Sequence, residues 1–158
     1  MGTTTRRHWL LADPRARALA LTLVAVAAAG ATDLGYRSLI ASQGIVQPPG
    51  DYWSRVDFVT FFIGGIAAAA LGGAVLLGLR RDTAASLLLA AAFTGSAALG
   101  FLALFSIGLA LVVVAALLAL SMAGSSRAKG WRWRAAHLVP VTLSLGVLIA
   151  GIGATGGW

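Results

Sequence analysis

The fold is decided by residues 83–123, which read TAASLLLAAAFTGSAALGFLALFSIGLALVVVAALLALSMA and contain no charged side chain. As a single helix, with about 1.5 Å of rise per residue, this stretch would be about 60 Å long, twice the roughly 30 Å of a bilayer's hydrocarbon core. It must therefore fold back on itself. The turn is predicted at residues 97–101, where Gly100 supplies the permissive backbone that a tight helical hairpin needs.

Three other stretches have the length and apolarity of membrane spans. They cover residues 16–35, 56–79 and 135–155, and each meets the requirement of roughly 20 mostly apolar residues. The folded-back segment adds two spans, at residues 83–99 and 101–123. The sequence thus predicts an all-α integral membrane protein, a bundle of five transmembrane helices.

The composition agrees with this class. The chain has 158 residues, of which 59% are hydrophobic and 11% charged, whereas a soluble domain carries about 25% charged residues. Its mean hydropathy is +0.89. Soluble enzymes and nucleic-acid-binding modules are therefore excluded, and the absence of Cys excludes disulfides and thiolate metal sites. Glu and Asn are absent and Arg far outnumbers Lys, a bias typical of GC-rich bacterial coding, so we expect a bacterial inner (plasma) membrane.

The distribution of basic residues predicts the orientation. Basic side chains collect in short cytoplasmic loops. Five spans with a cytoplasmic N-terminus and an external C-terminus leave only Arg37 and Arg55 outside, whereas four spans would put the basic loops on opposite sides. The basic residues that then face the cytoplasm are Arg6, Arg7, Arg15, Arg17, Arg80, Arg81, Arg127, Lys129, Arg132 and Arg134.

The same frame divides the chain into segments. Residues 1–15 form a cytoplasmic basic leader and residues 16–158 a single transmembrane domain. Within that domain, residues 36–55 form an external loop and residues 124–134 a cytoplasmic basic loop. The leader sequence TRRHWL at residues 5–10 resembles the twin-arginine export motif. Because Asp and Pro then interrupt the run into the apolar segment, we interpret residues 16–35 as an uncleaved first span.

The second cytoplasmic loop interleaves Arg with Trp in the sequence RAKGWRWR. Such a pattern can stack on nucleic-acid bases, but between two apolar spans it indicates anchoring to anionic lipid headgroups. We therefore expect no nucleic-acid partner. The predicted headgroup anchors are Arg80, Arg81, Arg127, Lys129, Trp131, Arg132, Trp133 and Arg134.

Small residues predict where helices approach closely. Lipid provides no hydrophobic drive for helix association, so small side chains that allow backbone contact become important. The span at 56–79 has two such stripes, made of Gly64, Gly65, Ala68, Ala69, Gly72 and Gly73. We expect this span at the centre of the bundle and the bulkier span at 101–123 facing lipid. The stripes either seat a partner helix or a second copy, or serve ordinary packing within the chain.

Candidate chemistry inside the membrane is sparse. An ionisable residue inside the membrane usually marks transport or catalysis. The middle of every predicted span lacks such a residue. Ser96 is separated from His137 by about 20 Å in depth, so the two are not expected to form a catalytic pair. Ser96 and Thr94 are expected to bond to backbone carbonyls or to make polar contacts between helices. His8 and His137 lack further ligands. The sequence therefore predicts no catalytic, cofactor-binding or metal site.

The external loop carries most of the residue variety of the chain. Asp33 with Arg37, and Asp51 with Arg55, stand four residues apart and are expected to pair across a helical turn. A polar outer face for a partner or ligand, or simply a loop that fixes two helix ends, is the expected role. Its members are Asp33, Arg37, Gln43, Gln47, Asp51, Arg55 and Asp57.

These observations predict a non-enzymatic protein. The first interpretation is an accessory or scaffold subunit that packs against a partner membrane protein or against itself. The second is a small oligomeric channel or permease with Asp33, Arg55 and Asp57 at its outer mouth. A membrane-embedded enzyme ranks last, because no spacing supports an acid-base pair.

Overall fold

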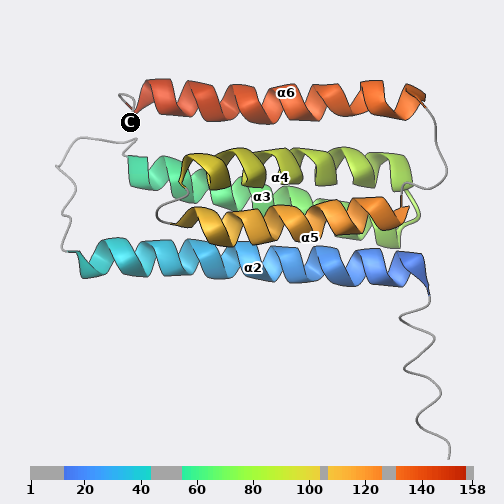
Figure 1. Cartoon of the computed structure of the whole chain (residues 1–158), viewed down its shortest axis with the longest axis horizontal. Helices are drawn as coiled ribbons and strands as arrows, with labels where there is room; N and C mark the ends of the chain where they lie inside the picture. The colour runs from blue at the N-terminus through green and yellow to red at the C-terminus, as the bar shows by residue number, and fades with distance from the viewer. Residues whose placement is uncertain (1–12, 44–54, 104–106, 126–130, 156–158) are drawn as a thin grey trace, which may run out of the picture.

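The computed structural model describes residues 13–43, 55–103, 107–125 and 131–155. Within these ranges the chain is helical, as expected, and successive helices run antiparallel (Figure 1). The helices are α2 (Pro14–Ser42), α3 (Arg55–Gly78), α4 (Asp82–Leu102), α5 (Leu109–Ser125) and α6 (Trp131–Ala154).

Four of these helices are long and apolar enough to cross a membrane. They are α2, α3, α4 and α6, while α5 is a shorter apolar helix. Large apolar side chains such as Phe61, Leu109 and Leu138 are exposed on the outside. An apolar exterior of this kind is expected where the solvent is lipid. The structure is thus consistent with a helical membrane bundle.

The uncharged segment folds back, but later than the sequence predicted. We expected the turn at residues 97–101; instead α4 continues to Leu102 and α5 begins at Leu109. Gly100 stays within α4, where a Cβ would lie only 3.1 Å from the carbonyl oxygen of Gly108. The glycine therefore allows two helices to approach closely and does not form the turn itself.

Helix α2 is longer than the predicted span at 16–35. Pro14 occupies its first turn, and the Asp13 side chain accepts a hydrogen bond from the Arg15 amide at 2.9 Å, a favourable start for a helix. At the other end the helix continues to Ser42, so the first part of the predicted external loop is helical. The predicted Asp33–Arg37 pair is confirmed, with 2.9 Å between Oδ2 and Nε.

The connection between α3 and α4 is a tight C-terminal cap. The Arg81 amide donates to the Leu76 carbonyl at 2.8 Å, and the Arg80 amide donates to the Leu77 carbonyl at 3.1 Å. This is the Schellman arrangement, in which the residue after the helix adopts positive φ. Arg80 does so with φ of 60°. The cap holds two exposed arginines at the turn.

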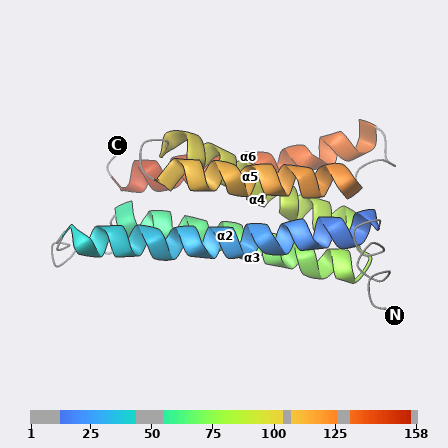
Figure 2. The ribbon, with the colours of Figure 1, turned by 60° about the horizontal axis from the view of Figure 1, so that its bottom comes forward.

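Helices α2, α3, α4 and α5 form a ring in which each contacts its two neighbours. Helix α6 lies outside this ring, mainly against α4 and only slightly against α3 (Figures 1 and 2). The 60° rotation in Figure 2 shows α6 beside α4, with the α2 and α3 pair on the other side. The protein is thus a four-helix bundle with one appended helix.

The burial pattern corrects two expectations about the packing. The most apolar window of α4 is 50% buried, against 39% for α3, so the central helix is α4 and not the span at 56–79. The span at 101–123 does not simply face lipid: Leu111, Val114 and Leu118 of α5 are fully buried. They recur at helical spacing and form one packed face. Side-chain bulk alone does not indicate which way a membrane helix faces.

Candidate functional site

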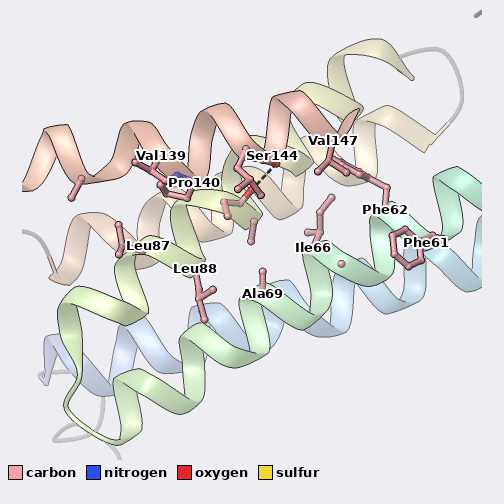
Figure 3. Close-up of a pocket in the computed structure, with 15 residues that line it drawn as sticks. Phe61, Phe62, Ile66, Ala69, Leu87, Leu88, Val139, Pro140, Ser144 and Val147 are labelled. Atoms are coloured by element: carbon pink, nitrogen blue, oxygen red, sulfur yellow. Dashed lines mark hydrogen bonds between the residues drawn. The ribbon is translucent and has the colours of Figure 1, made fainter. Parts of the chain in front are cut away.

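An apolar cleft of about 660 Å³ lies between α3, α4 and α6. In Figure 3 the side chains of α3 and α6 face one another across it, with α4 contributing the floor. Several lining residues, including Phe61, Val139 and Leu143, are exposed, so the cleft opens at the surface of the bundle. The lining consists of Phe61, Phe62, Gly65, Ile66, Ala69, Leu87, Leu88, Ala91, Ala92, Ala136, Val139, Pro140, Leu143, Ser144 and Val147.

The cleft exists because α3 and α6 meet near one end and separate toward the other. Gly151 of α6 packs directly on the ring of Phe58 in α3, in space that a Cβ would occupy. Gly95 of α4 also lies close to α6, since a Cβ there would be 3.0 Å from the Ser144 hydroxyl. From these contacts the two helices diverge toward the α3–α4 turn (Figures 2 and 3).

Few polar groups line the cleft. The Ser144 hydroxyl donates to the Ala91 carbonyl at 3.3 Å, which joins α6 to α4. Pro140 lies inside α6 and has no amide hydrogen, so the Ala136 carbonyl lacks the donor that would normally stand four residues later. The other lining residues are apolar. The surface of the cleft is thus almost entirely apolar, with the Ser144 hydroxyl as the one polar side chain among its lining residues.

The open end of the cleft points toward a basic end of the bundle. The start of α2, the α3–α4 turn and the start of α6 lie together at this end (Figure 1). Arg80 and Arg81 are exposed there, beside a small polar depression that also includes Asp82. Asp82 is engaged by Arg15, whose Nη2 lies 2.5 and 2.7 Å from its two carboxylate oxygens. In the described part of the chain, Arg80 and Arg81 form no ion pair.

The glycine stripe of α3 divides between two environments. A Cβ on Gly73 would lie 2.7 Å from Leu89, and one on Gly72 would lie 3.0 Å from Leu88, so both glycines pack against α4. A Cβ on Gly64 or Gly65 would meet nothing within 4 Å. Ala69, like Gly65, lines the cleft, while Ala68 and Gly64 are exposed outside it.

The predicted external polar face is only partly within the described residues. Asp33 and Arg37 pair near the end of α2, where Asp33 Oδ1 is buried without a hydrogen bond. Gln43 caps the same helix through its backbone amide. Arg55 and Asp57 lie in the first turn of α3, at the same end of the bundle (Figure 1). The remaining members, Gln47 and Asp51, lie outside the described residues.

The predicted headgroup anchors that the structure describes lie at one end of the bundle. Arg80 and Arg81 lie at the α3–α4 turn, and residues 131–134, which comprise Trp131, Arg132, Trp133 and Arg134, form the first turn of α6. Arg127 and Lys129 fall outside the described residues.

Of the two histidines, His8 lies outside the described residues and His137 belongs to α6. Within the described ranges, no group of three His, Cys, Asp or Glu side chains is placed to hold a metal ion.

Hydroxyl groups make the buried polar contacts. Ser96 donates to the Ala92 carbonyl at 2.6 Å and Thr94 to the Ala90 carbonyl at 2.9 Å, so of the two expected roles both take the bond to a backbone carbonyl of their own helix. Sequence reasoning missed a polar cluster between α2 and α5. There the Thr22 and Ser121 hydroxyls lie 2.7 Å apart, and both also contact the Ala18 carbonyl at 2.9 Å.

The cluster has two hydroxyl protons for three short contacts. One hydroxyl therefore donates to the Ala18 carbonyl, and the other donates either to the same carbonyl or to its hydroxyl neighbour. Thr22 and Ser121 are both fully buried. Hydroxyls within two apolar helices are a signal for such a link, but sequence alone does not say which two meet.

The chain matches no protein-family model, no curated protein and no solved structure.

Proposed function

We propose that the chain crosses the inner membrane of a bacterium five times, with its N-terminus in the cytoplasm. Support comes from the antiparallel order of the helices, which gathers Arg15, Arg17, Arg80 and Arg81 at one end of the bundle. Positive charge favours the cytoplasmic side. The α-helical part of α5 has 17 residues, or about 25 Å of rise, a shortfall that local bilayer thinning accommodates.

Reporter fusions test this topology. Fusions after Arg81 and Lys129 should report a cytoplasmic location, and a fusion after Tyr52 an external one. A further fusion after Gly100, close to the end of α4, should also report an external location. An external Lys129 would contradict the five-span arrangement.

Within that topology, the proposed role is that of a non-enzymatic accessory or scaffold subunit that packs against a partner membrane protein or a second copy. The observation that carries this proposal is the outward face of α3. There Gly64 and Ala68 are exposed at four-residue spacing, and a Cβ on Gly64 would have open space around it. Such a surface lets a neighbouring helix approach to backbone contact, and small residues of this kind are enriched where helices associate in lipid.

The channel or permease remains the alternative, but the packing favours it less. Ile63, Leu89 and Leu118 fill the centre of the ring and are fully buried. Among the described residues, the buried polar side chains are all serine or threonine, and their hydroxyls form hydrogen bonds within the protein. None of these buried side chains is ionisable. Conduction needs a polar or wettable path. An enzyme is favoured least, since the cleft supplies no acid-base pair.

Copurification tests the role directly. The full chain, extracted from its own membrane in mild detergent, should retain a membrane-protein partner or a second copy. Gly64→Leu should reduce that retention at least fivefold, because the new side chain separates the two backbones. Ala116→Leu, at an exposed position of α5, is the control and should retain the partner. A monodisperse monomer at every detergent strength would contradict the proposal.

A further inference from the structure

We propose that the cleft between α3, α4 and α6 is a lipid site, which holds one acyl chain of an anionic phospholipid from the leaflet at the basic end of the bundle. The inference requires the chain to lie in a bilayer. It does not depend on the proposed protein partner or on the exact number of spans.

The length of the cleft fits one leaflet. On α6 the lining runs from Ala136 to Val147, which corresponds to about 16 Å of helical rise. Half of a hydrocarbon core of roughly 30 Å is about 15 Å. The cleft therefore has the length that an acyl chain covers between the headgroup region and the bilayer midplane.

The shape of the cleft suits a flexible chain. The cleft narrows toward its far end, where Gly151 packs on Phe58, and it widens toward the basic end of the bundle (Figure 3). A narrow flexible chain follows a space that tapers in this way, whereas a rigid helix about 10 Å wide keeps a constant width.

Hydrophobicity alone does not favour the cleft over the bilayer, since lipid chains are as apolar as leucine side chains. Two other terms distinguish it. First, an unfilled cleft deprives its lining side chains of dispersion contacts, which an acyl chain restores. Second, the cleft ends beside fixed positive charge, which attracts an anionic headgroup.

The charge at the open end is available to a ligand. Asp82, the acidic residue of this turn, is already paired with Arg15. Arg80 and Arg81 are exposed beside it, and in the described ranges neither forms an ion pair. Leu87 is the lining residue of α4 nearest the α3–α4 turn, and it lies about 7.5 Å along the helix axis from Asp82. The N-terminal ends of α4 and α6, with their positive dipole ends, point the same way.

Native mass spectrometry of the full chain released from nanodiscs tests the site. The nanodiscs contain equal amounts of phosphatidylglycerol and phosphatidylcholine. The wild type should retain one phosphatidylglycerol per chain. Gly65→Leu places a side chain in the cleft at a position where a Cβ meets nothing within 4 Å, and it should reduce retention at least fivefold. Gly64→Leu, one residue away and outside the cleft, should leave retention unchanged.

A second pair of variants tests the headgroup. Arg80→Asn with Arg81→Gln removes both charges, and Asn tolerates the positive φ at the turn. Each basic residue near an anionic surface contributes about fivefold in affinity, so the preference for phosphatidylglycerol over phosphatidylcholine should fall at least fivefold. Ala69→Leu, a second cleft-filling change, should reproduce the effect of Gly65→Leu, and circular dichroism should show unchanged helicity in every variant.

Three results would overturn the inference: no retained lipid, equal retention in Gly65→Leu and Gly64→Leu, or equal retention of the two headgroups by the wild type. Copurification of protein partners is measured on the same variants, extracted from their own membrane in mild detergent. Because Gly64→Leu should affect the protein partner and Gly65→Leu the lipid, failure of one proposal is distinguishable from failure of the other.

Discussion

The ring of α2, α3, α4 and α5 and the appended helix α6 use the same kinds of residue to different ends. In the ring, small side chains let neighbouring helices approach closely, as where Gly73 meets Leu89. In α6, close contact is concentrated near Gly151 and Ser144, and beyond them the helix leaves the cleft open. The most apolar window of α6 is only 6% buried. Similar apolar sequences thus give a buried core in one region and a largely exposed wall in the other.

The difference teaches that a glycine in a membrane helix has no fixed role. Gly72 and Gly73 are adjacent and both face α4, but their neighbours differ. Leu89 is fully buried and has no space to move into, whereas Leu88 borders the cleft. What a substitution costs therefore depends on whether the neighbouring side chain can be displaced.

The largest expected effect breaks the ring. Gly73→Ala places a Cβ 2.7 Å from the fixed Leu89 side chain, and overpacking of this kind costs about 1–3 kcal/mol. Gly72→Ala should be close to neutral, because Leu88 can move into the cleft and alanine favours the helix. Thermal unfolding in detergent measures both. Equal destabilisation by the two changes would show that the cleft gives Leu88 no freedom.

The next effect separates α6 from the four-helix ring. Gly151→Ala displaces the Phe58 side chain from its contact with α6, and the expected cost in unfolding free energy is about 1–2 kcal/mol. Because the ring of four helices is intact, hydrogen exchange should accelerate in α6 and remain unchanged in α4. Gly153→Ala, where a Cβ has open space, serves as the control. Faster exchange across the whole chain would show that α6 unfolds together with the ring.

A smaller effect concerns the hydroxyl cluster of the ring. Thr22→Val and Ser121→Ala each remove one hydroxyl from the contact at 2.7 Å. Hydrogen bonds between membrane helices contribute about 0.6 kcal/mol on average and about 1.7 kcal/mol at most. A double-mutant cycle on unfolding free energies should give a coupling in this range. A coupling of zero would mean that the two hydroxyls act independently through the Ala18 carbonyl.

The smallest effect is electrostatic. Asp82→Asn removes the ion pair with Arg15, whose side chains are 49% and 37% exposed, respectively. Exposed pairs of this kind contribute about 0.2–1 kcal/mol. The loss should be measurable at low salt and should diminish at about 1 M salt, where the Debye length is about 3 Å. A loss that is independent of salt would indicate that Asp82 acts instead as a helix-terminal hydrogen-bond acceptor.

Particular residues show how far sequence reasoning reached. The uncharged run at 83–123 required a hairpin, and spacing predicted the Asp33–Arg37 pair; both are present. The position of that turn was wrong by a few residues, because Gly100 makes a contact between α4 and Gly108 that sequence does not reveal. The cleft was not predicted at all. Its lining comes from three helices, and no local pattern marks residues that meet only after folding.

By itself the sequence determined that the chain is a helical membrane protein, where its apolar helices lie and which end carries the positive charge. These properties follow from length, apolarity and charge, which are local quantities. Only the tertiary structure decided that α4 is central, that α5 has a buried face and that α3 and α6 diverge. The physical reason is that every face of such a helix is apolar, so pattern does not distinguish core from lipid. Detailed packing then sets the arrangement.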